Sequence, residues 1–222
     1  MTRYEILQKN AGWFIFFVLV VISAGGLAEI VPLFFIRAAS GVGSPVATVA
    51  GLRPYDALRL EGRDIYLREG CSGCHTQMIR SLYRDAERYG RPSVAGESAY
   101  DHPFLWGSRR TGPDLARVGG HYSIFWHQEH LRDPRSVVPW SVMPPYPWLE
   151  KTVLDGFQTV GKMRRMNILF SLTCPTCAHY SEKEIQEGPG KVRGKTESDA
   201  LIAYLYGDAE QPGGLGGGTH HE

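Results

Sequence analysis

The sequence has almost no excess of charge of either sign. Its 222 residues include 24 basic and 23 acidic side chains, so the formal net charge is +1. Proteins that bind nucleic acid through its phosphates carry a clustered excess of Lys and Arg. We therefore expect no nucleic-acid partner.

Cysteine is also scarce, and no cysteine stands alone. The four cysteines form two CxxC pairs, Cys71 with Cys74 and Cys174 with Cys177. This usage is typical of an oxidising compartment, where thiols are either alkylated by a cofactor or joined in disulfides. For the second pair a local disulfide is the first expectation, and a redox-active dithiol or a metal site that includes His179 are the alternatives.

One stretch near the N-terminus lacks charge altogether. No charged residue lies between Ala11 and Ala28, and the apolar character resumes after Glu29. Residues 13–36 span about 36 Å as a helix, enough to cross a hydrocarbon core of about 30 Å. The stretch is longer than the apolar region of about 7 to 15 residues in a cleaved signal peptide. We predict a retained single transmembrane anchor in contact with membrane lipid.

The rest of the chain reads as one mainly α domain. The pattern predicts helices over residues 56–69, 121–134 and 198–206, the last opened by a capping box at Thr196 and Asp199. Residues 79–106 show little periodicity and predict a long inserted loop that docks on a partner. The predicted segments are a tail (1–12), the anchor (13–36), a linker rich in Gly, Ala, Ser and Pro (37–55), the domain (56–208) and a flexible tail (209–222).

The pentapeptide Cys71-Ser72-Gly73-Cys74-His75 carries the chemistry. In c-type haem attachment two cysteines bond to the porphyrin vinyl groups, and the histidine that follows them ligates the iron. The alternative is a zinc or iron-sulfur site built from both CxxC pairs. Zinc ribbons separate their pairs by about 15 to 20 residues, whereas Cys74 and Cys177 are 103 positions apart. The spacing favours one covalent haem c, with His75 as proximal ligand.

Met143 is the best candidate for the second axial ligand. It stands in Val142-Met143-Pro144-Pro145-Tyr146-Pro147, where the prolines stiffen an extended loop that can present a thioether to a metal. Met78 follows the histidine too closely to reach the opposite face of the haem. Met1 lies beyond the membrane, and Met163 and Met166 are expected to pack.

The arginines and histidines that lie between the CxxCH motif and Met143 in the sequence are weaker candidates for contact with the haem. Arg109, Arg110 and Arg117 cluster around a Gly-Pro turn, and guanidinium groups can pair with haem propionates. We expect one of the three to do so and assign Arg110. His127 and His130, on the predicted helix 121–134, are expected to be packed or exposed rather than iron ligands.

Several long motifs together resemble the mono-haem cytochrome c subunit (CcoO or FixO type) of cbb3-type haem-copper oxidases. The resemblance covers most of the chain. It implies a class I-like cytochrome c domain in which the carbonyl of Pro113 accepts a hydrogen bond from His75, and in which the terminal helix crosses the one before the haem turn. The motifs are CSGCHTQMIR, ERYGRPSVAGE, YDHPFLWGSRRTGPDLARVGG and MPPYPWL.

The resemblance also implies a place in a complex. The partners would be the catalytic subunit, which holds b-type haems and copper, and a di-haem cytochrome c subunit or a soluble cytochrome c as donor. The subunit would not be catalytic alone. Because c-type haem is attached on the outer side of the membrane, the N-terminus would be cytoplasmic and the domain would lie in the periplasm of a bacterial inner membrane. The alternatives are the cytochrome subunit of a nitric oxide reductase and a haem-based gas or redox sensor.

Overall fold

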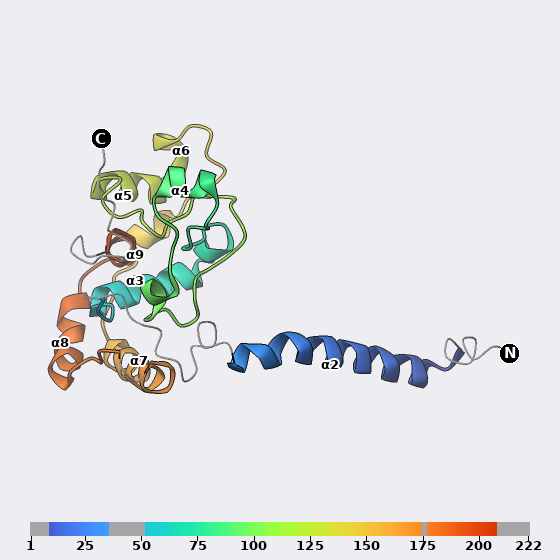
Figure 1. Ribbon diagram of the computed structural model, residues 1–222. Helices are drawn as coiled ribbons and strands as arrows, with labels where there is room; N and C mark the ends of the chain where they lie inside the picture. Colours follow the sequence, from blue (N-terminus) through green and yellow to red (C-terminus); the bar gives the residue numbers. More distant parts are fainter. Residues whose placement is uncertain (1–8, 36–51, 175–176, 208–222) are drawn as a thin grey trace.

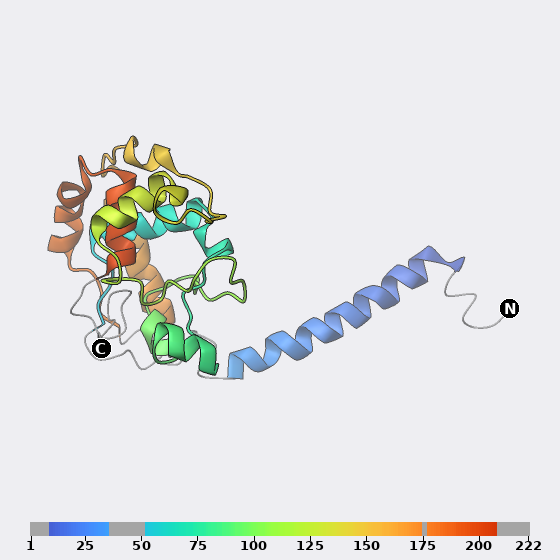
Figure 2. The same cartoon turned by 90° about the horizontal axis from the view of Figure 1, so that it is seen from above.

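The computed structural model describes residues 9–35, 52–174 and 177–207 of the chain. Within these ranges the protein is built from helices and irregular segments, with a single isolated β-bridge between Val153 and Thr196. One long apolar helix stands apart from a globular helical part (Figures 1 and 2). The predicted fold class, a mainly α cytochrome c domain behind one apolar helix, is confirmed.

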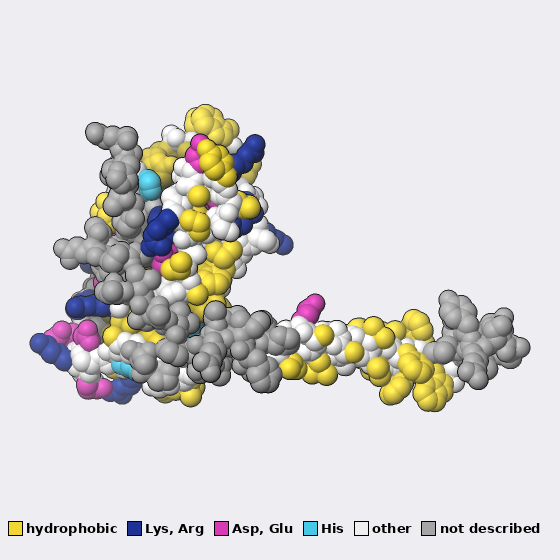
Figure 3. Space-filling view, viewed as in Figure 1, with side chains coloured by type: hydrophobic (Ala, Val, Ile, Leu, Met, Phe, Trp, Pro, Cys, Tyr) yellow, Lys and Arg dark blue, Asp and Glu magenta, His cyan; other side chains and the backbone are white. Residues whose placement is uncertain are grey.

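Helix α2 runs over Ala11–Phe35. Its apolar span, Ala11–Val31, is long enough to cross a membrane and has no part buried against the rest of the described protein. Hydrophobic side chains cover most of its visible face, while charged side chains lie mainly on the globular part (Figure 3). Such a surface is stable only in a non-aqueous environment, so α2 fits a single-pass membrane anchor.

The globular part is organised around the crossing of α3 (Ala57–Arg68) and α9 (Glu197–Tyr206). Gly62 lies at the crossing, where an added Cβ would come within 1.9 Å of the Ala200 carbonyl oxygen and 2.8 Å of Tyr204 Cβ. Tyr66 and Tyr204 pack together with ring centroids 5.6 Å apart. The predicted contact between the terminal helix and the helix before the haem turn is therefore confirmed.

Both helices begin with a side-chain N-cap, and the one at α9 is the cap that the sequence predicts. The Asp56 side chain accepts from the Arg59 backbone N–H at the start of α3. Thr196 and Asp199 form the predicted reciprocal capping box at the start of α9. These bonds satisfy backbone donors that would otherwise lack partners.

The predicted insertion, residues 79–106, is more ordered than its sequence suggested. It contains the short helix α4 (Tyr83–Tyr89) and the 3₁₀ turn η2 (Ala95–Ser98). It is also tied to the domain, because buried Asp101 accepts from the Tyr55 hydroxyl at 2.9 Å and pairs with Arg63 of α3 at 3.3 Å. A docking role for the insertion stays a prediction.

The remaining helices cover the two ends of the crossing. At one end lie α5 (Ile124–Arg132) and α6 (Pro134–Val137), and Asp133 between them is both the C-cap of α5 and the N-cap of α6. At the other end α7 (Thr159–Thr173) and α8 (Glu182–Val192) pack together. Cys174 and Cys177, between α7 and α8, form the disulfide that was the first expectation. The 3₁₀ turn η3 spans Pro147–Glu150.

The predicted segment boundaries stay predictions. Most of the predicted linker, the whole flexible tail and Met1 lie outside the described residues.

Candidate haem site

Cys71 opens the 3₁₀ turn η1 (Cys71–Gly73), directly after α3, and Cys74 is the C-cap residue of that turn. Gly70 makes the junction with φ of 72°, a left-handed conformation that costs glycine little. The backbone N–H groups of Cys74 and His75 both donate to the Cys71 carbonyl, at 3.1 and 2.8 Å. Both thiols are free, that of Cys71 half-buried and that of Cys74 exposed. One turn of backbone therefore presents two thiols and an imidazole together.

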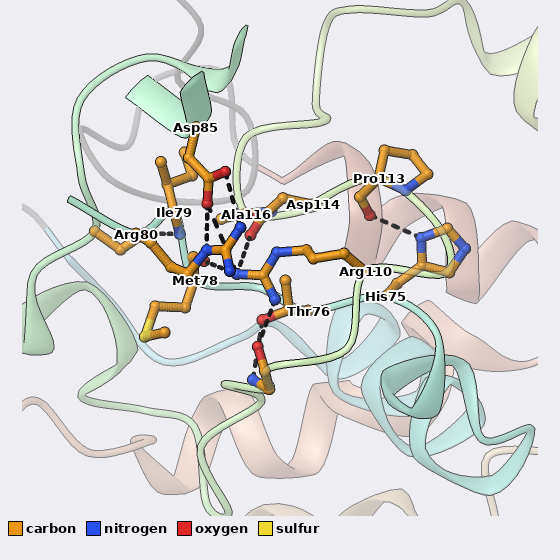
Figure 4. Close-up of polar contacts among 12 residues, drawn as sticks. His75, Thr76, Met78, Ile79, Arg80, Asp85, Arg110, Pro113, Asp114 and Ala116 are labelled. Atoms are coloured by element: carbon orange, nitrogen blue, oxygen red, sulfur yellow. Dashed lines mark hydrogen bonds and ion pairs between the residues drawn. The ribbon is translucent and has the colours of Figure 1, made fainter. Parts of the chain in front are cut away.

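The ring of His75 is held in one orientation by the chain around it. Its Nδ1 lies 2.9 Å from the Pro113 carbonyl oxygen, which as an acceptor requires the proton to be on Nδ1 (Figure 4). The ring also lies against Gly112, where an added Cβ would come within 2.2 Å of Cε1. Among the described residues Nε2 makes no hydrogen bond. The lone pair of Nε2 is therefore available to a metal.

The protonation state of His75 suits metal binding. Burial lowers the pKa of its imidazole, and the Pro113 carbonyl and the Asp114 carboxyl oppose this shift. The lowered pKa keeps the ring neutral near pH 7, and the neutral imidazole is the form that ligates metals.

The loop that carries Pro113 is bonded to the segment that follows the haem turn. The Gly112 N–H donates to the Cys74 carbonyl at 3.0 Å, and the Leu115 N–H donates to the Thr76 carbonyl at 2.9 Å. The Gly107 N–H donates to the Thr76 hydroxyl at 3.0 Å. These bonds hold the loop 107–115 against the segment 74–76, although the two are 30 to 40 positions apart in the sequence. The imidazole of His75 lies between them.

The three predicted arginines have different surroundings. Arg110 directs its guanidinium group to the carbonyls of Gly107, Arg109 and Met78. Arg117 is buried, donates to the Arg91 carbonyl and pairs with a carboxylate of the insertion. Arg109 is exposed. The contact between Arg110 and a propionate stays a prediction.

Met143 lies in an extended segment that ends where the Tyr146 N–H donates to the Leu131 carbonyl at 2.8 Å. The side chain of Met143 is half-buried and packs against the same core cluster as Cys71 and Leu115. The pKa of Tyr146 is raised, first by burial and then by Cys71 and Cys74, so this loop lies beside the haem turn. The structure thus brings Met143 to the region of the motif, and its role as ligand stays a prediction.

Two histidines of α5, His127 and His130, lie near the haem turn, and the sequence did not predict this position. His130 stacks on Trp126, and Trp126 stacks on Tyr122, with ring centroids 4.6 and 3.9 Å apart. The pKa of His130 is lowered by burial and then by its electrostatic interaction with His75, and its buried Nδ1 has no partner within the described part of the chain. The sequence does carry a signal for this stack. Tyr122, Trp126 and His130 are spaced four residues apart within the predicted helix 121–134, and this spacing places their rings on one face.

The second histidine, His127, is buried, the packed one of the two states that the sequence left open. Its Nε2 has no hydrogen-bond partner among the residues that the structure describes, and burial lowers its pKa to about 4. His127 is therefore neutral near pH 7 and sits in an apolar setting.

The residues present fit a haem c. Two free thiols stand on one turn, a neutral imidazole offers an unengaged Nε2, and a thioether packs on the same core. The other CxxC pair is closed as a disulfide. Within the described ranges no three His, Cys, Asp or Glu side chains are grouped to hold a metal ion. The arrangement does not fit a zinc site built from both pairs.

The fold and the site define the class as cytochrome c domains carried on an apolar helix. The match to known families narrows this class. Residues 4–207 match the family model described as cytochrome c oxidase, mono-heme subunit/FixO, and the chain belongs to that family. No curated protein matches the chain. The family carries one haem and works as a subunit of an oxidase, in association with other oxidase subunits.

Proposed function

We propose that this chain is the membrane-anchored electron-transfer subunit of a cbb3-type haem-copper oxidase. It takes electrons from a di-haem cytochrome c subunit or a soluble cytochrome c and passes them to a b-type haem of the catalytic subunit, where oxygen is reduced. The family assignment favours this role over the nitric oxide reductase and sensor alternatives. The observation that carries the proposal is the hydrogen bond from His75 Nδ1 to Pro113, which leaves Nε2 unengaged beside two free thiols.

Each site residue has one task in this proposal. Cys71 and Cys74 would hold the haem covalently through thioether bonds, and His75 and Met143 would ligate its iron. The Pro113 carbonyl keeps the imidazole proton on Nδ1 and makes the ring a more basic ligand. A haem bound there supplies a one-electron iron couple. Ligation by a thioether raises the reduction potential, which suits an acceptor late in a respiratory chain.

The orientation follows from the covalent attachment. In this proposal the domain lies in the periplasm, α2 crosses the bacterial inner membrane once, and the N-terminus is cytoplasmic. The anchor keeps the haem close to the membrane-embedded catalytic subunit. With His75 and Met143 both as ligands of the iron, this subunit would relay electrons and would not itself bind oxygen.

A paired comparison of cysteine variants tests the proposal. Solubilised oxidase that contains Cys71→Ala/Cys74→Ala is expected to lose the c-type haem of this subunit and most of the oxygen uptake driven by a reduced cytochrome c donor. The matched control is Cys174→Ala/Cys177→Ala, which changes the same residue types in a disulfide outside the site and is expected to keep both. An oxidase that takes up oxygen at the normal rate with the first pair replaced would contradict the proposal.

A further inference from the structure

The loop that carries Pro113 has a gap in its backbone bonding. On one side of the gap the Gln77 N–H donates to the Leu105 carbonyl at 3.0 Å, and on the other the Gly112 N–H donates to the Cys74 carbonyl at 3.0 Å. Residues 108–111 make no backbone hydrogen bond to another segment in the described part of the chain. Something other than backbone pairing must hold this stretch, because it leads directly to the acceptor of His75.

The side chain of Arg110 bridges the gap. Its Nη1 donates to the Gly107 carbonyl at 2.5 Å and to the Arg109 carbonyl at 3.1 Å. Its Nη2 donates to the carbonyl of Met78, on the opposite segment, at 3.1 Å. The guanidinium fork thus joins the loop to the segment that follows the haem turn, and the side chain is only 19% exposed.

Two carboxylates flank the same guanidinium group. Asp114 Oδ2 lies 3.8 Å from Nη2, and Asp85 Oδ2 lies 4.0 Å from it. Asp85 is itself held by two hydrogen bonds from Arg80, at 2.6 and 3.0 Å. Asp114 is buried, directly follows Pro113 and accepts from the Ala116 N–H at 2.8 Å. Figure 4 shows the Arg110 side chain running from beside His75 to this group of charges.

We propose that Arg110 is a positioning residue that holds the Pro113 carbonyl at hydrogen-bonding distance from His75 Nδ1. It does so by bonding Gly107, before the turn, to Met78, on the facing segment, and by attracting the carboxylate next to Pro113. A lysine cannot replace it, because one ammonium group lacks the planar fork that reaches two segments at once. The reduction potential can be measured only if a haem is bound, so this part of the test rests on the proposed function.

The sign of a change in reduction potential separates this role from a simple charge effect. The Nδ1–H···O bond makes the imidazole a more basic ligand and favours ferric iron. Loss of that bond therefore raises the potential. Loss of a positive charge near the haem acts in the opposite direction, because it stabilises the ferric form. A propionate contact of Arg110 predicts this second direction, with rescue by lysine.

The test compares Arg110→Gln and Arg110→Lys with the matched control Arg109→Gln, in the full-length, haem-loaded chain. Redox titration is expected to show a higher potential for Arg110→Lys, which keeps the charge, up to about a tenfold change in the ferrous-to-ferric ratio, or about 59 mV for one electron. The exchange of the His75 Nδ1 proton, followed by NMR in the reduced state, is expected to be up to about tenfold faster in both. Arg109→Gln, which removes the same charge from an exposed neighbour, is expected to change neither.

Two results would overturn the proposal: a normal potential in Arg110→Lys, or unchanged exchange of the Nδ1 proton in both Arg110 variants. If Arg110→Gln does not fold, Arg110→Lys keeps the charge and carries the same test. The exchange measurement can also be made on the chain without haem. A wild-type chain that carries no haem would refute the proposed function and leave the role of Arg110 to be decided by that exchange.

Discussion

The imidazole of His75 shows how a few local contacts prepare a metal ligand. Its proton is fixed on Nδ1 by the Pro113 carbonyl, and its face is pressed against Gly112, which has no side chain to displace it. Burial keeps the ring neutral. Position, tautomer and protonation state are thus all set by the polypeptide itself, so the ligand needs little rearrangement to bind iron.

Replacing Met143 tests the second axial ligand. In Met143→His a second imidazole would favour ferric iron, so we expect the haem to be retained and the midpoint potential to fall by a sizeable part of the ~0.8 V range that axial ligands span. A redox titration with optical detection measures this. Met166→His, on α7 in a half-buried position, is the control and is expected to leave the potential unchanged. An unchanged potential in Met143→His would mean that another residue is the ligand.

His127 gives the fold a defined dependence on pH. Its pKa is about 4 in the folded protein and about 6.5 in an unfolded chain. Between these values the unfolded chain binds more protons, so stability is lost as the pH falls below about 6.5. The linkage relation gives a loss of about 2 kcal/mol at pH 5 relative to pH 7.

We therefore expect His127→Phe to be about 2 kcal/mol less sensitive to this pH change than the wild type, by the same relation. Denaturant unfolding at pH 7 and pH 5 measures the difference. His121→Gln replaces an exposed histidine and is expected to keep the wild-type pH dependence. The same pH dependence in His127→Phe and the wild type would show that His127 is not held neutral by burial.

At the scale of single residues, the sequence predicted the chemistry better than the contacts. The CxxCH spacing is set by the cofactor, so the sequence alone predicts Cys71, Cys74 and His75 as haem residues, and the structure adds their geometry to that prediction. The contacts of Arg110 could not be, because a guanidinium group can reach a propionate, a carboxylate or a carbonyl, and the choice depends on the fold. The stacked rings of α5 were missed for a related reason, since their spacing is also that of an ordinary packed helix face.

At the scale of elements, the crossing of α3 and α9 places the haem turn. The crossing brings the C-terminal helix against the helix that ends at the turn, and the Tyr66 hydroxyl donates to the His75 carbonyl at 3.0 Å. The Tyr204 hydroxyl donates to the Gln77 side chain at 2.9 Å, just beyond the turn. Two buried tyrosines, one from each crossing helix, therefore hydrogen-bond to the haem turn and to the residue just beyond it.

Gly62→Ala tests how closely these helices must approach. The added methyl group would meet the Ala200 carbonyl and Tyr204, so we expect a loss of about 1–3 kcal/mol in the free energy of unfolding, the usual cost of overpacking. Gly190→Ala, in α8 with no atom near the added Cβ, is the control and is expected to be neutral or to stabilise by up to about 1 kcal/mol. Equal stability of Gly62→Ala and the wild type would contradict the close crossing.

The elements that were predicted well have both periodicity and caps. Helices α3 and α9 carry apolar spacing and a side-chain N-cap, so local rules suffice for them. Helix α4 was missed, because YRDAERY is short, polar and without a capping side chain. Asp85, in the first turn of α4, is held by Arg80, and no helix-periodicity rule contains such a contact.

At the scale of the whole molecule, the chain combines an apolar helix with a redox domain. Both parts were predictable, the helix from its length and lack of charge, and the domain from one pentapeptide and its flanking motifs. The segment around Cys174 and Cys177 was the least predictable, since a CxxC pair can be a disulfide, a dithiol or half of a metal site. The disulfide closes this pair and leaves Cys71 and Cys74 as the free thiols of the described chain.

The central claim is that a haem is bonded through sulfur to Cys71 and Cys74. The most direct measurement is the mass of the matured chain under denaturing conditions, where only covalent groups remain attached. The account predicts a mass equal to the polypeptide plus one haem, and loss of that increment in Cys71→Ala/Cys74→Ala. A matured wild-type chain with the mass of the bare polypeptide would contradict it.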